Sequence, residues 1–291
     1  MDIVINFNKP KNISSQEAVT GVKKIFHAKK AGHAGTLDPI ATGVLIVCLN
    51  EATKITRFLS DLDKEYMVRL RLGQRTDTYD LTGKILEEHD YHSIEGSHIS
   101  EVLKNFVGSI KQRPPMYSAI KMGGKPLYKF ARRGLEIEIP ERTVSIYGID
   151  FLGYDQPYLD LKISCSKGTY IRALCNDIGN ALGVGAHMVS LERTGVGKFR
   201  IEDSASIEEV ENKKDSWSSV DLALSYLKEI ILDANSYDKA RNGAPIIINL
   251  DKKYINNFVR LKDPKNILFG VGRVEYDRIK IERLFSNSHK S

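Results

Sequence analysis

The chain has 291 residues, of which 42% are hydrophobic and 27% charged, and its formal net charge is +6. A chain of this length can form about two domains with substantial cores, and its composition is ordinary for a globular protein. Its apolar runs are far shorter than the roughly 20 residues that a transmembrane helix needs, which excludes the helical membrane proteins.

The first quarter of the chain predicts a strand and two helices around a buried strand. Residues 3–7 alternate as a strand does, and Ser14 followed by Glu17 matches a capping box, which predicts a helix that continues to about residue 28. A second amphipathic helix is predicted over 55–62.

A loop with three glycines, one proline and a single acid, Asp38, spans 32–43, directly ahead of the apolar run 44–49. Glycine and proline specify backbone shape tightly, and the run behind them is typical of a buried strand. Loops on rigid scaffolds often carry chemistry, but aspartate is also a common turn residue. The residues of this loop alone leave both interpretations open.

The alternation over 64–73 predicts a half-buried antiparallel strand, and a polar loop follows over 76–83. Asp77 and Asp80 in this loop could bind a metal, but an Asp-x-x-Asp spacing is also typical of turns. The sequence favours the turn.

Apolar spacing over 99–110 predicts a helix, and a proline-first, glycine-last pattern predicts a short helix between Pro126 and Gly134. Strands are expected over 143–149 and 159–165, and a helix over 171–182. Arg172 stands in the first turn of that last helix, where a cation opposes the helix dipole. It therefore needs an anionic partner or ligand, and such local conflicts concentrate at functional sites.

Basic residues gather in two tracts without acids. Residues 111–133 hold seven Lys or Arg and three aromatic residues, and residues 20–37 hold four lysines. Such tracts suit a nucleic-acid backbone with unstacked bases, although any single tract is equally well a solvated surface. After about residue 225 the chain changes to short strand-like pieces, which predicts a larger domain over 1–225 and a small β-rich domain over 226–291.

The three cysteines, Cys48, Cys165 and Cys175, lie far apart and match neither a zinc site nor a disulfide framework. We interpret them as buried hydrophobic residues in a reducing compartment. The first residues also lack a signal-peptide pattern, so we expect a cytoplasmic protein.

Taken together, these stretches resemble one family, the bacterial tRNA pseudouridine-55 synthases of the TruB type. The family's glycine at position 12 is replaced by Asn12, which also tolerates positive φ. The resemblance runs in order from about residue 3 to 200, and its motifs lie at 9–15, 32–45, 64–66, 76–80, 114–121 and 167–172.

The family implies an α+β fold, with a mixed, largely antiparallel central sheet flanked by helices. It also implies an RNA-gripping insertion at about 111–134 and a small C-terminal PUA-like RNA-binding domain. The implied reaction isomerises uridine-55 in the T loop of tRNA to pseudouridine after base flipping. No metal or organic cofactor is implied, and we expect a monomer that binds the tRNA T stem-loop without an obligate protein partner or a membrane.

The resemblance also implies site residues. Asp38 would be the catalytic carboxylate, Arg172 would be held for it jointly with Asp80, and Tyr66 would stack on the uracil. Whether Asp38 attacks C1′, attacks C6 or removes the C2′ proton stays open. The other pocket and RNA contacts would come from Lys64, Tyr170, Lys167 and His33.

Three alternatives remain at this stage. A non-catalytic module could remodel tRNA without modifying it, or could do so beside the chemistry. An RNA-guided relative would work inside a ribonucleoprotein, but it would carry a fuller C-terminal domain. A metal-dependent hydrolase would use Asp77 and Asp80, and chelation would stop it.

Overall fold

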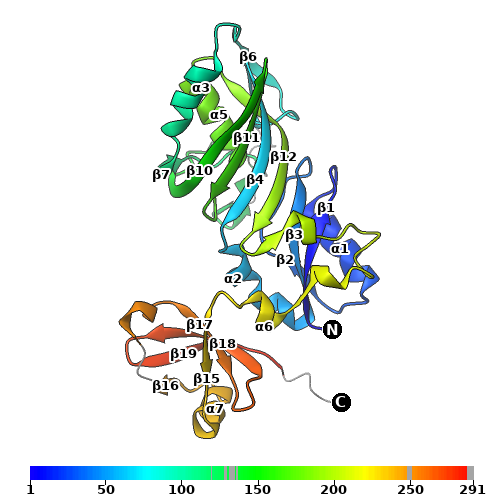
Figure 1. The fold of residues 1–291 in the computed structure, drawn as a ribbon, viewed down its shortest axis with the longest axis vertical. Helices are drawn as coiled ribbons and strands as arrows, with labels where there is room; N and C mark the ends of the chain where they lie inside the picture. Colours follow the sequence, from blue (N-terminus) through cyan, green and yellow to red (C-terminus); the bar gives the residue numbers. More distant parts are fainter. Residues whose placement is uncertain (119, 128–129, 131–134, 136, 248–250, 287–291) are drawn as a thin grey trace.

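The computed structural model describes residues 1–118, 120–127, 130, 135, 137–247 and 251–286. It shows an elongated molecule with a large sheet domain and a smaller β-rich domain at one end (Figure 1). None of the helices in these residues is long and apolar enough to cross a membrane.

A mixed sheet runs through the larger domain, and its main path orders the strands β14–β1–β3–β12–β4–β11–β10–β7. The printed pairings along this path are antiparallel except for that of β3 with β12. This confirms the predicted mixed, largely antiparallel sheet. The strands are β1 (Ile3–Lys9), β3 (Thr42–Leu49), β4 (Lys64–Leu72), β7 (Gly108–Gln112), β10 (Arg142–Asp155), β11 (Tyr158–Cys165), β12 (Ala186–Val196) and β14 (Trp217–Ser219), with β2 (Ala31–His33) beside β3 and β13 (Phe199–Arg200) beside β12.

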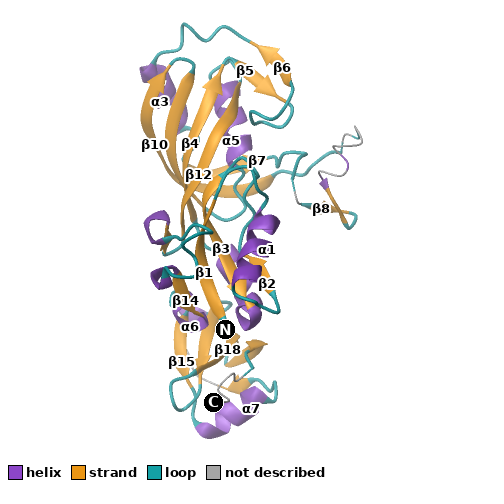
Figure 2. Ribbon diagram, turned by 90° about the vertical axis from the view of Figure 1, so that its right-hand side faces the viewer, coloured by secondary structure: helices purple, strands orange, loops and turns teal. Residues whose placement is uncertain are grey.

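Helices flank this sheet, as expected, and α3 and α5 cover one face of its upper part (Figure 1). The α-helices of this domain are α1 (Ser15–Ile25), α2 (Thr56–Ser60), α3 (Gly96–Lys104), α5 (Ile171–Ala181) and α6 (Val220–Ala223), and its 3₁₀ turns are η1 (Asn50–Ile55), η2 (Ile201–Asp203) and η3 (Lys214–Ser216). Two small hairpins, β5 (Gln74–Thr76) with β6 (Ile85–Glu88) and β8 (Lys121–Met122) with β9 (Lys125–Pro126), complete it. The β8 hairpin projects away from the body (Figure 2).

Local sequence signals account for several of these elements. The Ser14 hydroxyl accepts the Glu17 N–H at 3.1 Å, and the Glu17 carboxylate accepts the Ser14 N–H at 2.7 Å, so the capping box that starts α1 is confirmed. The helix ends at Ile25, slightly before the predicted residue 28. The run 44–49 is continuously apolar because β3 is buried on both faces.

Two sequence predictions fail, and one falls on residues that the structure does not describe. The helix predicted over 99–110 ends at Lys104, because Gly108 adopts a φ of 104° and opens β7, where Ile110 pairs with Val144. Strand β12 was not predicted, since bulges between residues 188 and 190 and between 193 and 195 break its alternation. The short helix predicted from Pro126 lies largely outside the described residues.

The C-terminal residues form a second sheet with the order β15–β17–β18–β19–β16 and a core of their own. This confirms the small β-rich domain. Its elements are β15 (Lys228–Ile231), α7 (Ala234–Arg241), β16 (Ile246–Ile247), η4 (Lys252–Tyr254), β17 (Phe258–Lys262), β18 (Leu268–Glu275) and β19 (Arg278–Leu284).

The small domain packs against α2 of the larger one. Phe58 and Phe258 meet edge to face with ring centroids 4.9 Å apart, and Arg57 forms an ion pair with Glu282 at 2.6 Å. Val271 of the small domain also belongs to the apolar cluster behind β3. Helix α2, which follows β3 and η1 along the chain, therefore packs against and supports the C-terminal domain.

Candidate active site

The Asp38 loop is tied to the connection between β1 and α1. The Asn12 N–H donates to the Pro39 carbonyl at 2.7 Å, and Ser15 Oγ accepts the Leu37 N–H at 2.8 Å. The fully buried Lys9 ammonium donates to carbonyls of the same connection and lies 3.4 Å from the Pro39 carbonyl. These bonds hold the backbone on both sides of Asp38.

Special backbone positions shape this loop. Asn12 has a φ of 69°, so asparagine adopts the left-handed conformation that the sequence comparison anticipated. At Gly43, with a φ of 95°, a Cβ would lie 2.4 Å from the Arg193 carbonyl oxygen. At Gly43 the chain that approaches the loop backbone most closely is therefore the protein's own strand β12.

Arg172 lies between Asp38 and Asp80. Its Nε is 2.7 Å from Asp38 Oδ2, one terminal nitrogen donates to Asp38 Oδ1 at 3.3 Å, and the other lies 3.5 Å from Asp80 Oδ2. The Nε–H is not directed at an acceptor, so the Asp38 contact is a close ion pair and not a symmetrical fork. The guanidinium, with 5% of its side chain exposed, serves two carboxylates at once.

Backbone carbonyls complete the coordination of Arg172. The two terminal nitrogens donate to the carbonyls of Thr78 and Tyr117, each at 3.0 Å. The start of α5 is itself fixed, because the Gln112 side chain accepts the Tyr170 N–H at 2.8 Å and donates to its carbonyl at 3.0 Å. A cation at this end of a helix opposes the dipole, and the two carboxylates compensate for it.

Asp80 is buried and its Oδ1 closes a turn. This oxygen accepts bonds from the Thr82 N–H at 2.9 Å, the Thr82 hydroxyl at 2.6 Å and the Thr78 hydroxyl at 2.7 Å. Asp77 similarly accepts the Lys84 N–H at 2.8 Å. Both acids therefore act as turn residues, and no cluster of three potential metal ligands occurs among the described residues.

The charge of Asp38 is finely balanced. Burial raises the pKa of its carboxyl above the ordinary value, Arg172 opposes this, and the like charge of Asp80 adds to it. Because 35% of the side chain remains exposed, water limits the size of the shift. The carboxylate is thus accessible, and its charged form is less well stabilised than that of a usual surface aspartate, which suits a base or nucleophile.

Tyr66 lies close to this carboxylate on the buried face of β4. Burial raises the pKa of its hydroxyl, while the positive charge of Arg193 lowers it and the charge of Asp38 raises it further. Its backbone pairs with Arg193 of β12. The site therefore combines an acid, a guanidinium and an aromatic ring from three separate elements.

Comparison with known proteins places this arrangement in a family. Residues 23–171 match the model described as TruB family pseudouridylate synthase (N terminal domain), and residues 172–237 match the one described as tRNA pseudouridylate synthase B C-terminal domain. The chain belongs to the TruB family. It is therefore a pseudouridine synthase, an isomerase.

Individual relatives cover the chain almost completely. It is similar to tRNA pseudouridine synthase B of Clostridium tetani, at 44% identity over 98% of this chain and 99% of the relative. That of Caldanaerobacter subterraneus subsp. tengcongensis is 42% identical over 98% and 99%. Among solved structures, a chain in the crystal structure of a Cbf5-Nop10-Gar1 complex is 27% identical with a TM-score of 0.78, covering 98% of this chain and 85% of that one.

The other predicted site residues of this TruB-family chain divide into two groups. Tyr170 lies near the ion pair, since Arg172 and Asp38 both influence its pKa, which burial raises. His33 borders the same loop in β2, and burial lowers its pKa. The ammonium groups of Lys64 and Lys167 are engaged elsewhere. Their pocket roles stay predictions.

The two lysines bind the end of α2. Lys64 donates to the carbonyls of Ser60 and Leu62, and burial lowers its pKa to about 8. Lys167 forms an ion pair with Asp61 at 2.9 Å and is more than half exposed. Each ammonium thus has a protein partner outside the Asp38 ion pair.

Our sequence analysis assigned no role to Lys9 and Arg193. Both are fully buried cations next to the Asp38 loop, and burial lowers the pKa of Lys9 to about 8. A lysine at the end of a strand that is otherwise uncharged was a signal for the first. The bulges of β12 concealed the second, because they hid the strand that carries it.

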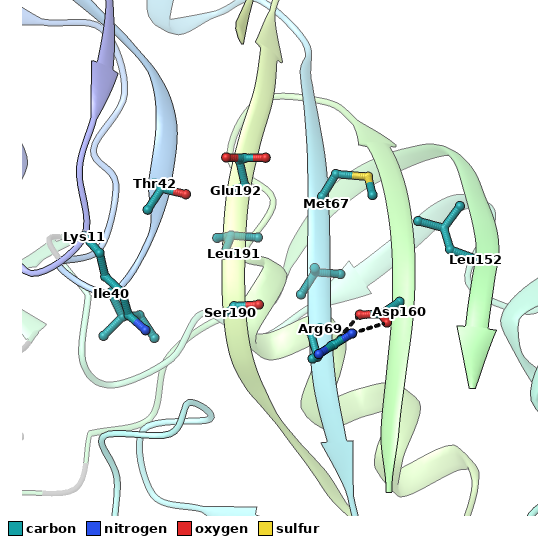
Figure 3. Close-up of a pocket in the computed structure, with 11 residues that line it drawn as sticks. Lys11, Ile40, Thr42, Met67, Arg69, Leu152, Asp160, Ser190, Leu191 and Glu192 are labelled. Atoms are coloured by element: carbon teal, nitrogen blue, oxygen red, sulfur yellow. Dashed lines mark hydrogen bonds and ion pairs between the residues drawn. The ribbon is translucent and has the colours of Figure 1, made fainter. Parts of the chain in front are cut away.

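A groove of about 540 Å³ lies on the opposite face of the sheet (Figure 3). Met67 and Arg69 line it, and they alternate along β4 with the buried Tyr66. Arg69 makes two bonds to Asp160, at 2.8 and 2.7 Å. The groove does not contain Asp38, so we do not assign the active site to it.

Proposed function

We propose that this chain converts uridine-55 in the T loop of tRNA to pseudouridine, with Asp38 as the catalytic carboxylate. The observation that carries the proposal is the Asp38–Arg172 ion pair at 2.7 Å, within a loop whose sequence matches the family motif. Relatives of 44% and 42% identity are named tRNA pseudouridine synthase B and match along nearly the whole chain.

The reaction is an isomerisation, so atoms and electrons balance without a redox partner. The N1–C1′ bond of uridine breaks, the uracil turns, and a C5–C1′ bond forms while C5 loses a proton and N1 gains one. The ionised Asp38 supplies the electron pair that this exchange needs. Arg172 opposes the effect of burial on that carboxylate and fixes its direction.

The target nucleotide must leave the base stack before Asp38 can reach it. The Tyr66 ring then receives the uracil by stacking, an interaction that tolerates any base. His33 packs against the RNA where the flipped nucleotide leaves the loop, and Tyr170, Lys64 and Lys167 contribute to the lining. Asp80 holds the far side of Arg172.

Backbone binding comes from the basic tract and the C-terminal domain. Lys111 and Arg113, exposed on and beside β7, begin the insertion at 111–134, which grips phosphates of the T stem-loop. The small domain over 226–291 extends this surface as a PUA-like RNA-binding unit. We propose that the protein acts in the cytoplasm as a monomer without an obligate protein partner.

The test is incubation of the full chain with an unmodified tRNA transcript, followed by mapping of pseudouridine. We expect product at position 55 and none in a matched transcript that carries cytidine there. Product at another uridine would contradict the position but not the chemistry. Absence of product with every transcript would contradict the proposed function.

A further inference from the structure

Arg193 of β12 is 1% exposed, and among the residues that the structure describes no carboxylate forms an ion pair with it. Its guanidinium instead donates to two backbone carbonyls, from Nε to Val44 at 2.7 Å and from a terminal nitrogen to Gly35 at 3.1 Å. Burying an arginine without a counter-charge is unfavourable. The interactions that Arg193 makes in its buried position must therefore offset this cost.

The two carbonyls belong to the two stems of the Asp38 loop. Gly35 precedes Asp38, and Val44 follows it as the third residue of β3, directly after Gly43. One planar guanidinium holds both stems at once, which a single ammonium could not do with the same fixed geometry. A side chain of another strand, β12, thereby links the two ends of the loop that carries Asp38.

The backbone of Arg193 makes a second connection. It pairs with Tyr66 on β4 on one side and with Gly43 on β3 on the other. Only a glycine allows the second contact, since a Cβ at position 43 would lie 2.4 Å from the Arg193 carbonyl oxygen. Arg193 is therefore the residue at which the strand of the acid meets the strand of the aromatic ring.

The electrostatic surroundings of Arg193 are also unusual. Burial is the main cause of the lowered pKa values of Lys9, His33 and Lys64, and the charge of Arg193 lowers all three further. The same charge opposes the effect of burial on the pKa of Tyr66. The positive charge of Arg193 thus acts on the hydroxyl of the ring that would contact the uracil.

We propose that Arg193 is a positioning residue for pseudouridylation, which fixes the Asp38 loop against the strand that carries Tyr66. This inference rests on the proposed function, in which Asp38 and Tyr66 face the uridine. A misplacement of about 1 Å costs roughly a hundredfold in rate. Loss of the clamp should therefore lower kcat more than it weakens tRNA binding.

The experiment compares Arg193→Lys and Arg193→Met in the full chain, with Arg200→Met as the matched control. Arg200 belongs to the next strand, is 42% exposed and pairs with Glu65 at 3.2 Å. Single-turnover rates and dissociation constants are measured with the unmodified tRNA transcript. We expect Arg193→Met to lose about a hundredfold in rate with its dissociation constant within about threefold of wild type. Arg193→Lys should recover part of the rate, and the control should match wild type.

A second readout needs no turnover. With ¹³C-labelled tyrosine, the Tyr66 ring carbon is assigned by Tyr66→Phe and titrated in each variant. Arg193→Met should raise the pH at which Tyr66 ionises, and Arg193→Lys should leave it nearer to wild type. Wild-type rates in both Arg193 variants, or a loss confined to tRNA binding, would overturn the proposal. An inactive wild type would contradict the proposed function instead, while the titration would still test the placement of the charge.

Discussion

Two ion-pair networks in this molecule differ in their ratio of cations to carboxylates. At Asp38, one guanidinium serves two carboxylates, those of Asp38 and Asp80. At the junction of the two domains, two cations serve two carboxylates in a closed ring. The four junction residues are Asp221 of α6, Glu229 of β15, and Arg260 and Lys262 of β17.

The difference shows how charge balance separates reactivity from stability. The shared guanidinium leaves the pKa of Asp38 above its ordinary value, with burial as the main cause. In the balanced ring, the hydrogen bonds that Lys262 donates to Glu229 and Asp221 raise its pKa and favour its charged form. A deficient network holds a carboxylate ready for chemistry, whereas a complete one holds two domains together.

Asp38→Asn tests the Asp38 network directly, and of the four variants it should have the largest effect on activity. The amide keeps the shape of the side chain but supplies no electron pair to uridine, so kcat should fall at least about a thousandfold. Binding of unmodified tRNA, measured by filter retention, should stay close to wild type. Turnover within tenfold of wild type would disprove the role of Asp38.

Arg172→Lys tests the shared cation. The guanidinium contacts both acids and two carbonyls, and a point charge cannot satisfy all four. We expect kcat to fall about a hundredfold, as measured by single-turnover pseudouridylation. The matched control is Arg69→Lys, which changes an exposed pair with Asp160 of similar distances and should be nearly neutral. Equal losses in both variants would argue against a special role for Arg172.

Lys262→Met tests the balanced ring. The Lys262 side chain is only 8% exposed, but its partner Asp221 is 33% exposed. The loss of stability should therefore lie between the values that are typical of exposed and of buried ion pairs. We expect the free energy of unfolding in urea to fall by about 2 kcal/mol, with kcat at saturating tRNA unchanged. Lys228→Met, at an exposed position of β15, is the control. A loss of kcat without a loss of stability would reverse our assignment of the two networks.

Asp80→Asn should have the smallest effect, a shift of pH dependence. In wild type the pKa of Asp38 is raised by burial and by the Asp80 charge, and activity requires the ionised form. Activity should therefore be lost as pH falls through this raised value. Removing the Asp80 charge lowers the pKa of Asp38, so the acidic limb of kcat/KM should move to lower pH. Asp77→Asn, in the same loop, should not move it, and a shift toward higher pH would contradict the model of repulsion.

Several features could be predicted because their causes are local. The capping box of α1 lies within four residues, the left-handed Asn12 follows from its own side chain, and β4 follows from period-two alternation. The order of motifs was enough to identify the family. Asp38, Tyr66 and Arg172 were named from those motifs before their geometry was known.

Other features could not be predicted, because they depend on neighbours that are distant in sequence. The bulges of β12 respond to its pairing with β4 and conceal its period, so both the strand and Arg193 were missed. The end of α3 and the start of β7 were also misplaced, because Ile110 pairs with Val144 of β10 and is therefore part of a strand. The ion pair of Lys167 with Asp61 likewise joins segments that are distant in sequence, while the pocket roles of Lys64 and Lys167 stay predictions.

The sequence by itself determined the family, the mixed α+β class and the identity of the acid in the 32–43 loop. Only the tertiary structure decided which charges meet. Arg172 lies 134 residues from Asp38 along the chain, and Arg193 reaches the same loop from β12. Period and capping act through adjacent residues, whereas the balance of a buried charge depends on every segment that folds around it. The Asp38 loop was therefore visible as a motif, but its clamp by Arg193 was visible only in the fold.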